Sequence, residues 1–335
     1  MSPTIRMFTS ALFVKFSGLI LLMLFTVGCS EDAVPKPSAG SETKVELSET
    51  QDKKNIALVM KTLTNPFFIE MERGARRAEK DLGIQLLVRT AAQETSIQQQ
   101  IGIVADLIRQ QVDAIVIAPG DSVELIPILK QAQDKGIVVI NIDNRLDQEY
   151  SKRVGLLNVP FISVDNELAA YNSTKVLTDK LIQPTEVAII EGIRGALNAE
   201  FRKNGAVRAF AETEFATLVA TESANWKIDE AFELITALYK DHPKIGAIFC
   251  ANDMMALGVI EYLQSTGKKD VRVAAFDAIP QALDAIKSGT LLATVDQQAA
   301  EQGYQGILSA NNLLSGKKMP LNIIIEAKTI TQPGQ

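Results

Sequence analysis

Short apolar runs rich in β-branched residues recur along the chain from Asn55 onward, and longer stretches separate most of them. The runs are apolar at nearly every position, which is typical of strands that are covered on both faces of a parallel sheet. The predicted strands are residues 56–60, 86–89, 114–117, 138–142, 161–164, 187–190, 217–221, 247–250, 271–275, 293–295 and 323–325.

The stretches between these runs are of helical length. Apolar residues recur there with the three- and four-residue spacing of amphipathic helices, as in residues 68–81, 96–110, 228–239 and 254–264. Strands that alternate with helices predict an α/β fold with doubly wound parallel sheets.

A sequence echo indicates that this architecture occurs twice. Residues 113–121 (DAIVIAPGD) align with 246–253 (GAIFCAND), and one strand later 139–143 (VINID) align with 273–277 (VAAFD). Parallel strands of α/β proteins resemble one another, so a single pair would carry little information. Two pairs in register, each ending in a polar residue, favour two similar lobes.

The first 29 residues differ from the rest of the chain. Arg6 and Lys15 are their only charged residues, and the apolar run 16–27 (FSGLILLMLFTV) is too short to span ~30 Å of hydrocarbon comfortably. We interpret residues 1–29 as a signal peptide. It ends in Thr-Val-Gly-Cys, which resembles a bacterial lipobox except that Thr26 replaces the usual Leu, so Cys29 is the expected lipidation site. The alternative is a chance Cys near an ordinary cleavage site.

Residues 30–54 are rich in Ser, Glu, Pro and Lys, and they predict a flexible tether. With Cys29 acylated, Cys250 would be the only remaining thiol, and an intramolecular disulfide is not expected. Its neighbours, Ala-Ile-Phe, predict a buried side chain.

Composition and charge exclude several classes of function. The 335 residues include 34 basic and 40 acidic side chains, a net charge of −6 that gives no reason to bind nucleic acid. The single His, His242, lies in a predicted helix-end loop, which argues against a Ser-His-Asp triad or a multi-His zinc site. No glycine-rich phosphate-binding motif follows a strand. We therefore expect no enzyme, no cofactor and no metal.

Ligands of open parallel sheets bind beyond the carboxyl ends of the strands. Two lobes that face one another would bring the polar residues at these ends together across a cleft. These residues are Lys61, Asn65, Asp143, Asn144, Arg145, Asn252, Asp253 and Asp277.

Over residues 55–331 the chain resembles the ribose-type periplasmic sugar-binding proteins, the substrate-binding components of ABC transporters. Five segments in the same order and spacing carry the resemblance: IALVM with LTNPFF at 56–68, Asp143, NDMMALG at 252–258, FD at 276–277 and ATVDQ at 293–297.

The resemblance implies the type 1 periplasmic binding protein fold, whose two lobes close on a sugar around a three-segment hinge. The hinge segments are expected near residues 163–165, 297 and 325–327. The implied N-terminal lobe is 55–164 with 298–326, and the C-terminal lobe is 165–297 with 327–335.

The resemblance also implies roles for individual residues. Aromatic rings cover the apolar faces of a sugar, and carboxylates, amides and Arg fix the direction of its hydroxyl hydrogen bonds. Asn65, Phe67 and Phe68 match the first ligand-contacting loop, Asp143 the hydroxyl-binding carboxylate, Arg202 the second-lobe arginine, Trp226 a stacking aromatic, Asn252 and Asp277 hydroxyl-binding positions, and Gln297 the hinge residue.

Some of these residues also have structural interpretations. Phe67 and Phe68 could pack a helix start against the core, and Asn65 before a proline is typical of a helix N-cap. Asp253 is better explained as the cap of the helix that follows it.

Two further residues are open to both interpretations. Trp226 lies between Asn225 and Lys227, a setting that favours the cleft over the core. Arg202 could form a surface ion pair, but its helix, 199–211, follows a strand end, which favours the site.

Departures from the ribose pattern bear on the ligand. The ribose pattern has a small hydroxyl residue at the position of Lys61, an amide at the position of Ala118 and an arginine at the position of Asn144. In this chain the arginine, Arg145, comes one position later. Ribose is therefore not the favoured ligand, and another pentose, a hexose, a sugar alcohol or a furanosyl signalling molecule fits the pattern. Lys61 could orient Asp143 or bind an acidic group or a gem-diol of the ligand.

The resemblance implies a monomer in the periplasm or at the cell surface, attached to a membrane only through lipid at Cys29. Its partners would be a small sugar, sugar alcohol or related polyol and an ABC permease. The alternative is a receptor that presents a sugar-like signal to a sensor kinase or chemoreceptor. A related transcriptional repressor would need a DNA-binding segment where this chain has its predicted signal peptide.

Overall fold

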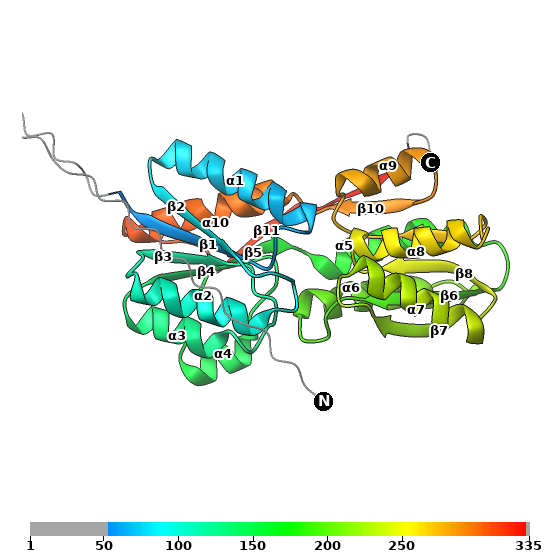
Figure 1. Ribbon diagram of the computed structural model, residues 1–335, viewed down its shortest axis with the longest axis horizontal. Coiled ribbons are helices and arrows are strands. Elements are labelled where there is room, and N and C mark those ends of the chain that lie inside the picture. The colour runs from blue at the N-terminus through cyan, green and yellow to red at the C-terminus, as the bar shows by residue number, and fades with distance from the viewer. Residues whose placement is uncertain (1–52, 333–335) are drawn as a thin grey trace, which may run out of the picture. The chain divides into compact units, whose positions relative to one another are not determined.

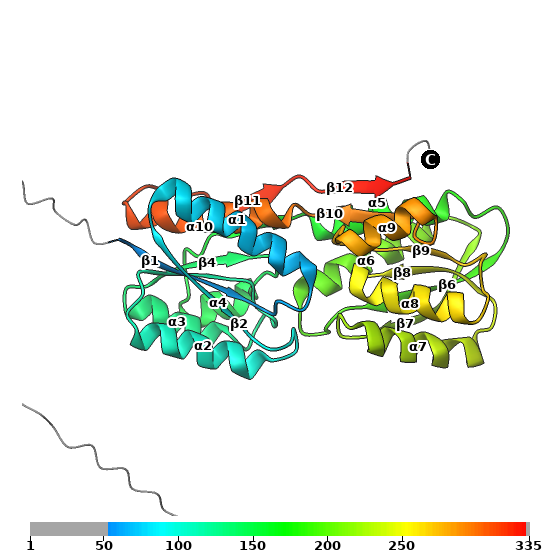
Figure 2. The same ribbon diagram turned by 45° about the horizontal axis from the view of Figure 1, so that its top comes forward.

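Two six-stranded sheets organise the residues that the structure, a computed structural model, describes: 53–332 (Figures 1 and 2). These residues belong to one compact unit, Gln51–Gln335. The predicted signal peptide, Cys29 and residues 30–52 of the predicted tether lie outside the described residues. None of the described helices is long and apolar enough to cross a membrane.

The first lobe contains the sheet β11-β5-β4-β3-β1-β2, whose neighbouring strands are all parallel. Its elements are β1 (Asn55–Met60), α1 (Pro66–Leu82), β2 (Gln85–Thr90), α2 (Ile97–Arg109), β3 (Ala114–Ile117), α3 (Ile126–Asp134), β4 (Val138–Ile142), α4 (Gln148–Val154), β5 (Phe161–Val164), α10 (Ala299–Leu314) and β11 (Asn322–Ile325).

The second lobe contains the sheet β12-β10-β9-β8-β6-β7, in which only β12 is antiparallel to its neighbour. Its elements are α5 (Asn166–Thr178), β6 (Thr185–Glu191), α6 (Leu197–Ala211), β7 (Ala216–Ser223), α7 (Ile228–Asp241), β8 (Ile245–Cys250), α8 (Asp253–Ser265), β9 (Arg272–Ala274), α9 (Pro280–Ser288), β10 (Ala293–Asp296) and β12 (Lys328–Thr331).

The two sheets follow the same order along the chain, so each strand of the first lobe has a counterpart in the second. The two echoing segments contain β3 and β8, and then β4 and β9, which occupy equivalent places in their sheets. The prediction of two similar doubly wound lobes is therefore confirmed.

Strand β1 shows why these runs are apolar at every position. Its side chains point alternately to the two faces of the sheet. Ile56, Leu58 and Met60 lie in one core with residues of α1 and α10, whereas Ala57 and Val59 lie in another with residues of α2 and α3. Figure 1 shows these two helix pairs on opposite sides of the sheet. Because both faces are buried there, residues 56–60 leave no position for a polar side chain.

The chain passes between the lobes at three places among the described residues: from β5 to α5, from β10 to α10, and from β11 to β12. At the second crossing Gln298 has a φ of 53°, and its side chain donates to the carbonyl of Glu326 at the third. Two of the crossings are thus joined directly.

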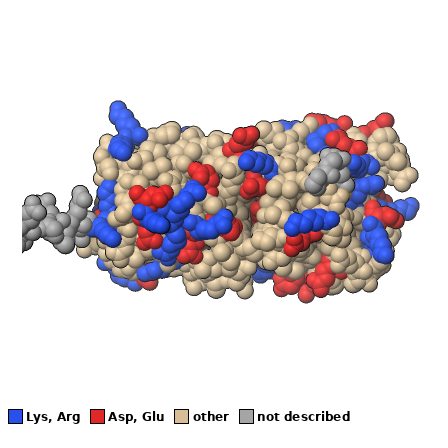
Figure 3. Space-filling model, turned by 90° about the horizontal axis from the view of Figure 1, so that it is seen from above, with Lys and Arg blue, Asp and Glu red and all other residues tan. Residues whose placement is uncertain are grey.

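Basic and acidic side chains are intermixed on the face seen in Figure 3. Arg76 of α1 pairs with Glu72 and Glu79 of its own helix, and Arg77 pairs with Glu301 of α10. On the face drawn, these arginines are therefore paired with neighbouring carboxylates.

Candidate functional site

A small cavity lies where the carboxyl ends of strands from both sheets meet. Ten of the eleven residues predicted to bind ligand line it, together with two that were not predicted, Glu94 and Asn198. The lining is Lys61, Asn65, Phe67, Phe68, Glu94, Asp143, Asn198, Arg202, Trp226, Asn252, Asp277 and Gln297.

The first lobe supplies a charged corner made of Lys61, Glu94 and Asp143. Lys61 Nζ lies 2.8 Å from Asp143 Oδ2 and 3.9 Å from Glu94 Oε2, and the Lys61 and Asp143 side chains are each only 2% exposed. Of the roles predicted for Lys61, pairing with Asp143 is the one seen. From the second lobe, Asn198 Nδ2 donates to Asp143 Oδ1 at 3.3 Å.

The start of α1 forms the wall beside this corner. Asn65 is the N-cap of α1, as predicted, and its Oδ1 accepts from the backbone of Phe67 while its Nδ2 donates to Glu94. Phe67 and Phe68 are buried, meet edge to face at 5.0 Å, and both line the cavity. The structural and cavity-lining roles are therefore combined in the same residues.

Arg202 of α6 is the cation of the second lobe. Its guanidinium donates to Asn166 Oδ1 at 2.8 Å and to the Ala251 carbonyl at 2.9 Å. It also donates to Asp277 and to Gln297, in both cases at 3.4 Å. With 3% of its surface exposed, Arg202 does not form a surface ion pair, and that alternative is wrong.

Trp226 is buried against the cavity, and the guanidinium carbon of Arg202 lies 5.6 Å from the centroid of its ring. A Cβ at Gly192 would lie 2.0 Å from the Trp226 ring, so only glycine allows the indole to lie there. The indole Nε1 and Asn198 Oδ1 are buried without a hydrogen bond among the described residues. Buried polar atoms are nearly always paired, so both are available to a ligand.

Three lining residues have the left-handed backbone that favours glycine: Asp143 (φ 62°), Trp226 (φ 67°) and Asp277 (φ 121°). Such conformations cost ~1 to 3 kcal/mol each and concentrate at functional sites. Asp143 comes directly after β4, and Asp277 comes shortly after β9, the strand of the second lobe that corresponds to β4. Each lobe therefore has a carboxylate with a strained backbone at the equivalent place.

Burial raises the pKa of two carboxyls in this cavity. For Glu94 the nearby Lys61 opposes the rise. For Asp277 burial raises the pKa to about 7, opposed by Arg202 and increased by Glu94 and Asp143. Gln297 Nε2 also donates to Asp277 Oδ1 at 2.7 Å.

We expect the unliganded protein to lose stability as pH rises from about 4 toward 7. Asp277 binds a proton in the folded state over a range in which the unfolded side chain, with its ordinary pKa of 3.8, has released it. The Asp277→Asn variant should lose part of this slope in melting temperatures measured between pH 4 and pH 8. Parallel pH profiles of the two proteins would contradict the raised pKa.

One prediction at the second lobe is wrong. Asn252, not Asp253, is the N-cap of α8, and its Oδ1 accepts from the backbone of Met255. Asp253 is the first helical residue, is fully buried, and accepts from Thr294 Oγ1 and from the backbone of Ile279. It joins α8 to the β9–α9 loop and to β10.

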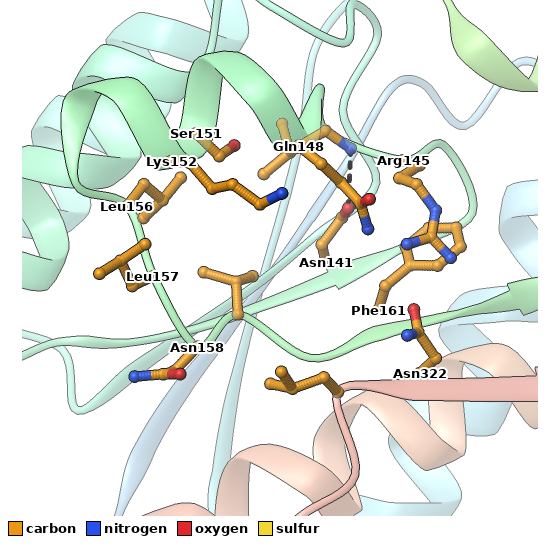
Figure 4. Close-up of a pocket in the computed structure, with 13 residues that line it drawn as sticks. Asn141, Arg145, Gln148, Ser151, Lys152, Leu156, Leu157, Asn158, Phe161 and Asn322 are labelled. Carbon is orange, nitrogen blue, oxygen red and sulfur yellow. Dashed lines mark hydrogen bonds between the residues drawn. The ribbon is translucent and has the colours of Figure 1, made fainter.

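The structure does not bring Asn144 into this cavity, and Arg145 lies outside it as well. Arg145 stacks on Phe161 at 4.0 Å in a separate surface pocket of the first lobe, shown in Figure 4. In the same pocket Asn141 accepts from the backbone of Leu146 and so holds the loop that carries both residues. Arg145 therefore does not replace the arginine of the ribose pattern in the cavity.

Glu94 and Asn198 were missed, although a signal for both exists. Glu94 comes four residues after the end of β2, and Asn198 lies in the first turn of the helix that follows β6. Both occupy the carboxyl ends of strands, the places at which the other residues were sought.

A model of the periplasmic binding protein domain matches residues 56–318. A D-ribose/D-allose-binding protein of Pseudomonas aeruginosa is 39% identical over 81% of this chain and 85% of its own length. The D-allose-binding periplasmic protein of Escherichia coli is 35% identical over 82% and 89%.

Among solved structures, a periplasmic solute-binding protein of an ABC transporter from Actinobacillus succinogenes, with bound D-allose, is 36% identical. The similarity covers 84% of this chain and 98% of that chain, with a TM-score of 0.79. The match spans both lobes and the cavity between them. The chain belongs to the periplasmic binding protein family, a non-enzymatic family, as a sugar-binding periplasmic component of ABC transporters.

Proposed function

We propose that the protein captures an aldohexopyranose of the D-allose type and delivers it to an ABC permease. The observation that carries this proposal is the corner of Lys61, Glu94 and Asp143, which offers a cation and two carboxylates within one small volume. A hexose has a hydroxymethyl group that a pentose lacks, and this corner suits the additional hydroxyl. The relative from Escherichia is named for D-allose, and the relative from Pseudomonas is named for both D-ribose and D-allose.

In this proposal the ring lies between Phe67 or Phe68 and Trp226, and polar groups surround its edge. Asp143 accepts from hydroxyls, whereas Lys61 and Arg202 can only donate. A sugar with one inverted hydroxyl leaves a buried group unpaired at a cost of ~1 to 3 kcal/mol, and this cost selects between epimers.

Capture proceeds by closure of the lobes around the three crossings, with residues 55–164 and 298–326 moving against 165–297 and 327–335. The sugar stabilises the closed form only through its higher affinity for that form. The closed monomer then docks on the permease.

The test is a fluorescence titration of the fragment from Gln51 onward, because Trp226 is the only tryptophan of the chain. We expect a saturable change with D-allose and at least ~10-fold weaker binding of D-ribose. Lys61→Ser should reduce this preference, because it restores the small hydroxyl residue of the ribose pattern. Equal affinities for both sugars in both proteins would contradict the role of the corner, and no response to any monosaccharide would contradict the function.

The protein is exported and anchored by lipid at Cys29, with residues 30–54 as the tether. The lipobox-like end of the predicted signal peptide supports this part of the proposal. Cys29→Ser should release the protein from the membrane fraction into the soluble fraction. A variant that stays in the membrane fraction would contradict the lipid anchor.

A further inference from the structure

Helix α6 begins without a cap of its own. Its N-cap residue is Ala196, whose side chain cannot accept a hydrogen bond. The first backbone N–H groups of a helix have no partner within the helix, so those of Leu197 and Asn198 need an acceptor from elsewhere.

The first lobe supplies both acceptors. Ser122 Oγ, in the loop after β3, accepts from the backbone of Leu197 at 3.0 Å. Asn144 Oδ1, in the loop after β4, accepts from the backbone of Asn198 at 3.1 Å. The backbone N–H of Ser122 in turn donates to the carbonyl of Gly195 at 3.0 Å. A helix of one lobe is thus capped by two side chains of the other.

Asn144 is fixed in place for this contact. It is fully buried, its Nδ2 donates to the carbonyl of Pro119 at 3.1 Å, and its own carbonyl accepts from Asn141 Nδ2 at 2.8 Å. Ser122 Oγ lies 3.3 Å from Asn144 Oδ1, so the two caps are joined. All of these partners belong to the first lobe, and they hold the acceptors ready before the lobes meet.

We propose that Ser122 and Asn144 are positioning residues that act as an interlobe cap: they stabilise the closed form by capping α6, without touching the sugar. The inference rests on the proposed function, because the cap acts on lobe closure. Closure forms both capping bonds and at the same time brings Asn198 Nδ2 to within 3.3 Å of Asp143. Opening breaks the capping bonds, so the cap slows release of the sugar.

Gly195 lets the two surfaces approach. A Cβ at this position would lie 2.1 Å from Asp121 Oδ2. The other oxygen of this carboxylate, Oδ1, accepts hydrogen bonds from the backbone N–H groups of Val123 and Glu124, so the carboxylate is restrained. The clash exists only when the lobes are together. Gly195→Ala should therefore obstruct closure while each lobe still folds, and adding Asp121→Ala should relieve the obstruction.

The experiment compares D-allose and D-ribose binding by the wild-type fragment, Asn144→Ala and Ser122→Ala, with dissociation rates from stopped-flow Trp226 fluorescence. The contribution of a capping side chain to helix stability corresponds to a ~2- to 30-fold change in a dissociation rate. We expect dissociation to accelerate by this factor, equally for both sugars, with little change in the association rate. The radius of gyration with saturating sugar should increase in Gly195→Ala.

Gln133→Ala is the matched control, because Gln133 also bonds backbone groups through its amide, at both the N–H and the carbonyl of Leu157, but within the first lobe. It should leave both dissociation rates unchanged. Unchanged rates in both cap variants would overturn the proposal, and so would an effect on one sugar only, which would indicate direct contact. A wild-type protein that binds no sugar would instead refute the proposed function, and the cap with it.

Discussion

Asp143→Ala should abolish detectable sugar binding, with an affinity at least ~100-fold below that of the wild type. The carboxylate is the acceptor for sugar hydroxyls, and hydrogen bonds to a charged group contribute ~1.5 to 3 kcal/mol each. Its loss also leaves Lys61, 2% exposed, without its nearest counter-charge at 2.8 Å. Removing one partner of a buried ion pair costs ~3 to 5 kcal/mol, so the melting temperature should fall as well.

A double variant separates recognition from stability. Lys61→Met combined with Asp143→Asn removes both charges of the pair, so neither is left buried without its partner, and Asn tolerates the left-handed backbone at position 143. It should recover the melting temperature lost in Asp143→Ala but not the binding. The affinity is measured by calorimetric titration with D-allose. If the Asp143→Ala protein kept the affinity of the wild type, Asp143 would not contact the sugar.

Much of the fold is encoded in the strands themselves. Because helices cover both faces of each sheet, the central strands are apolar runs, and all eleven predicted runs overlap observed strands. The twelfth, β12, was missed because its sequence, Lys-Thr-Ile-Thr, has a single apolar residue and so forms no apolar run. Its place depends on antiparallel pairing with β10, which no local pattern reveals.

The sequence predicts those features of the candidate site that follow from the topology of the sheets. Polar residues after the strands converge in one cavity because the carboxyl ends of parallel strands share an edge. Which of two neighbours enters the cavity depends on backbone geometry: Asp143, with its positive φ, lines the cavity, and Asn144 turns to the start of α6. Asn252 and Asp253 divide in the same way, and their sequence does not reveal which one caps α8.

The Arg202→Ala variant should lose both sugar binding and ~3 to 5 kcal/mol of stability toward unfolding. The guanidinium gathers Asn166, the Ala251 carbonyl, Asp277 and Gln297 around one buried cation, and each of these groups loses a partner when it is removed. Asp277 would also lose the charge that holds its pKa down, so near pH 7 it would be largely protonated and a weaker acceptor for hydroxyls.

Arg208→Ala on the same helix is the matched control for this variant. Arg208 pairs with Glu167 at 3.4 Å, but its side chain is 44% exposed, and surface pairs contribute ~1 kcal/mol or less. Arg202→Lys completes the series, because it keeps the charge but cannot reproduce the planar fork that reaches three directions at once. We expect unfolding free energies to fall in the order wild type, Arg208→Ala, Arg202→Lys, Arg202→Ala, with sugar affinity unchanged in the first variant and lower in the other two. If Arg202→Lys bound D-allose as tightly as the wild type, the charge alone would suffice, and the geometry of the fork would have no part in recognition.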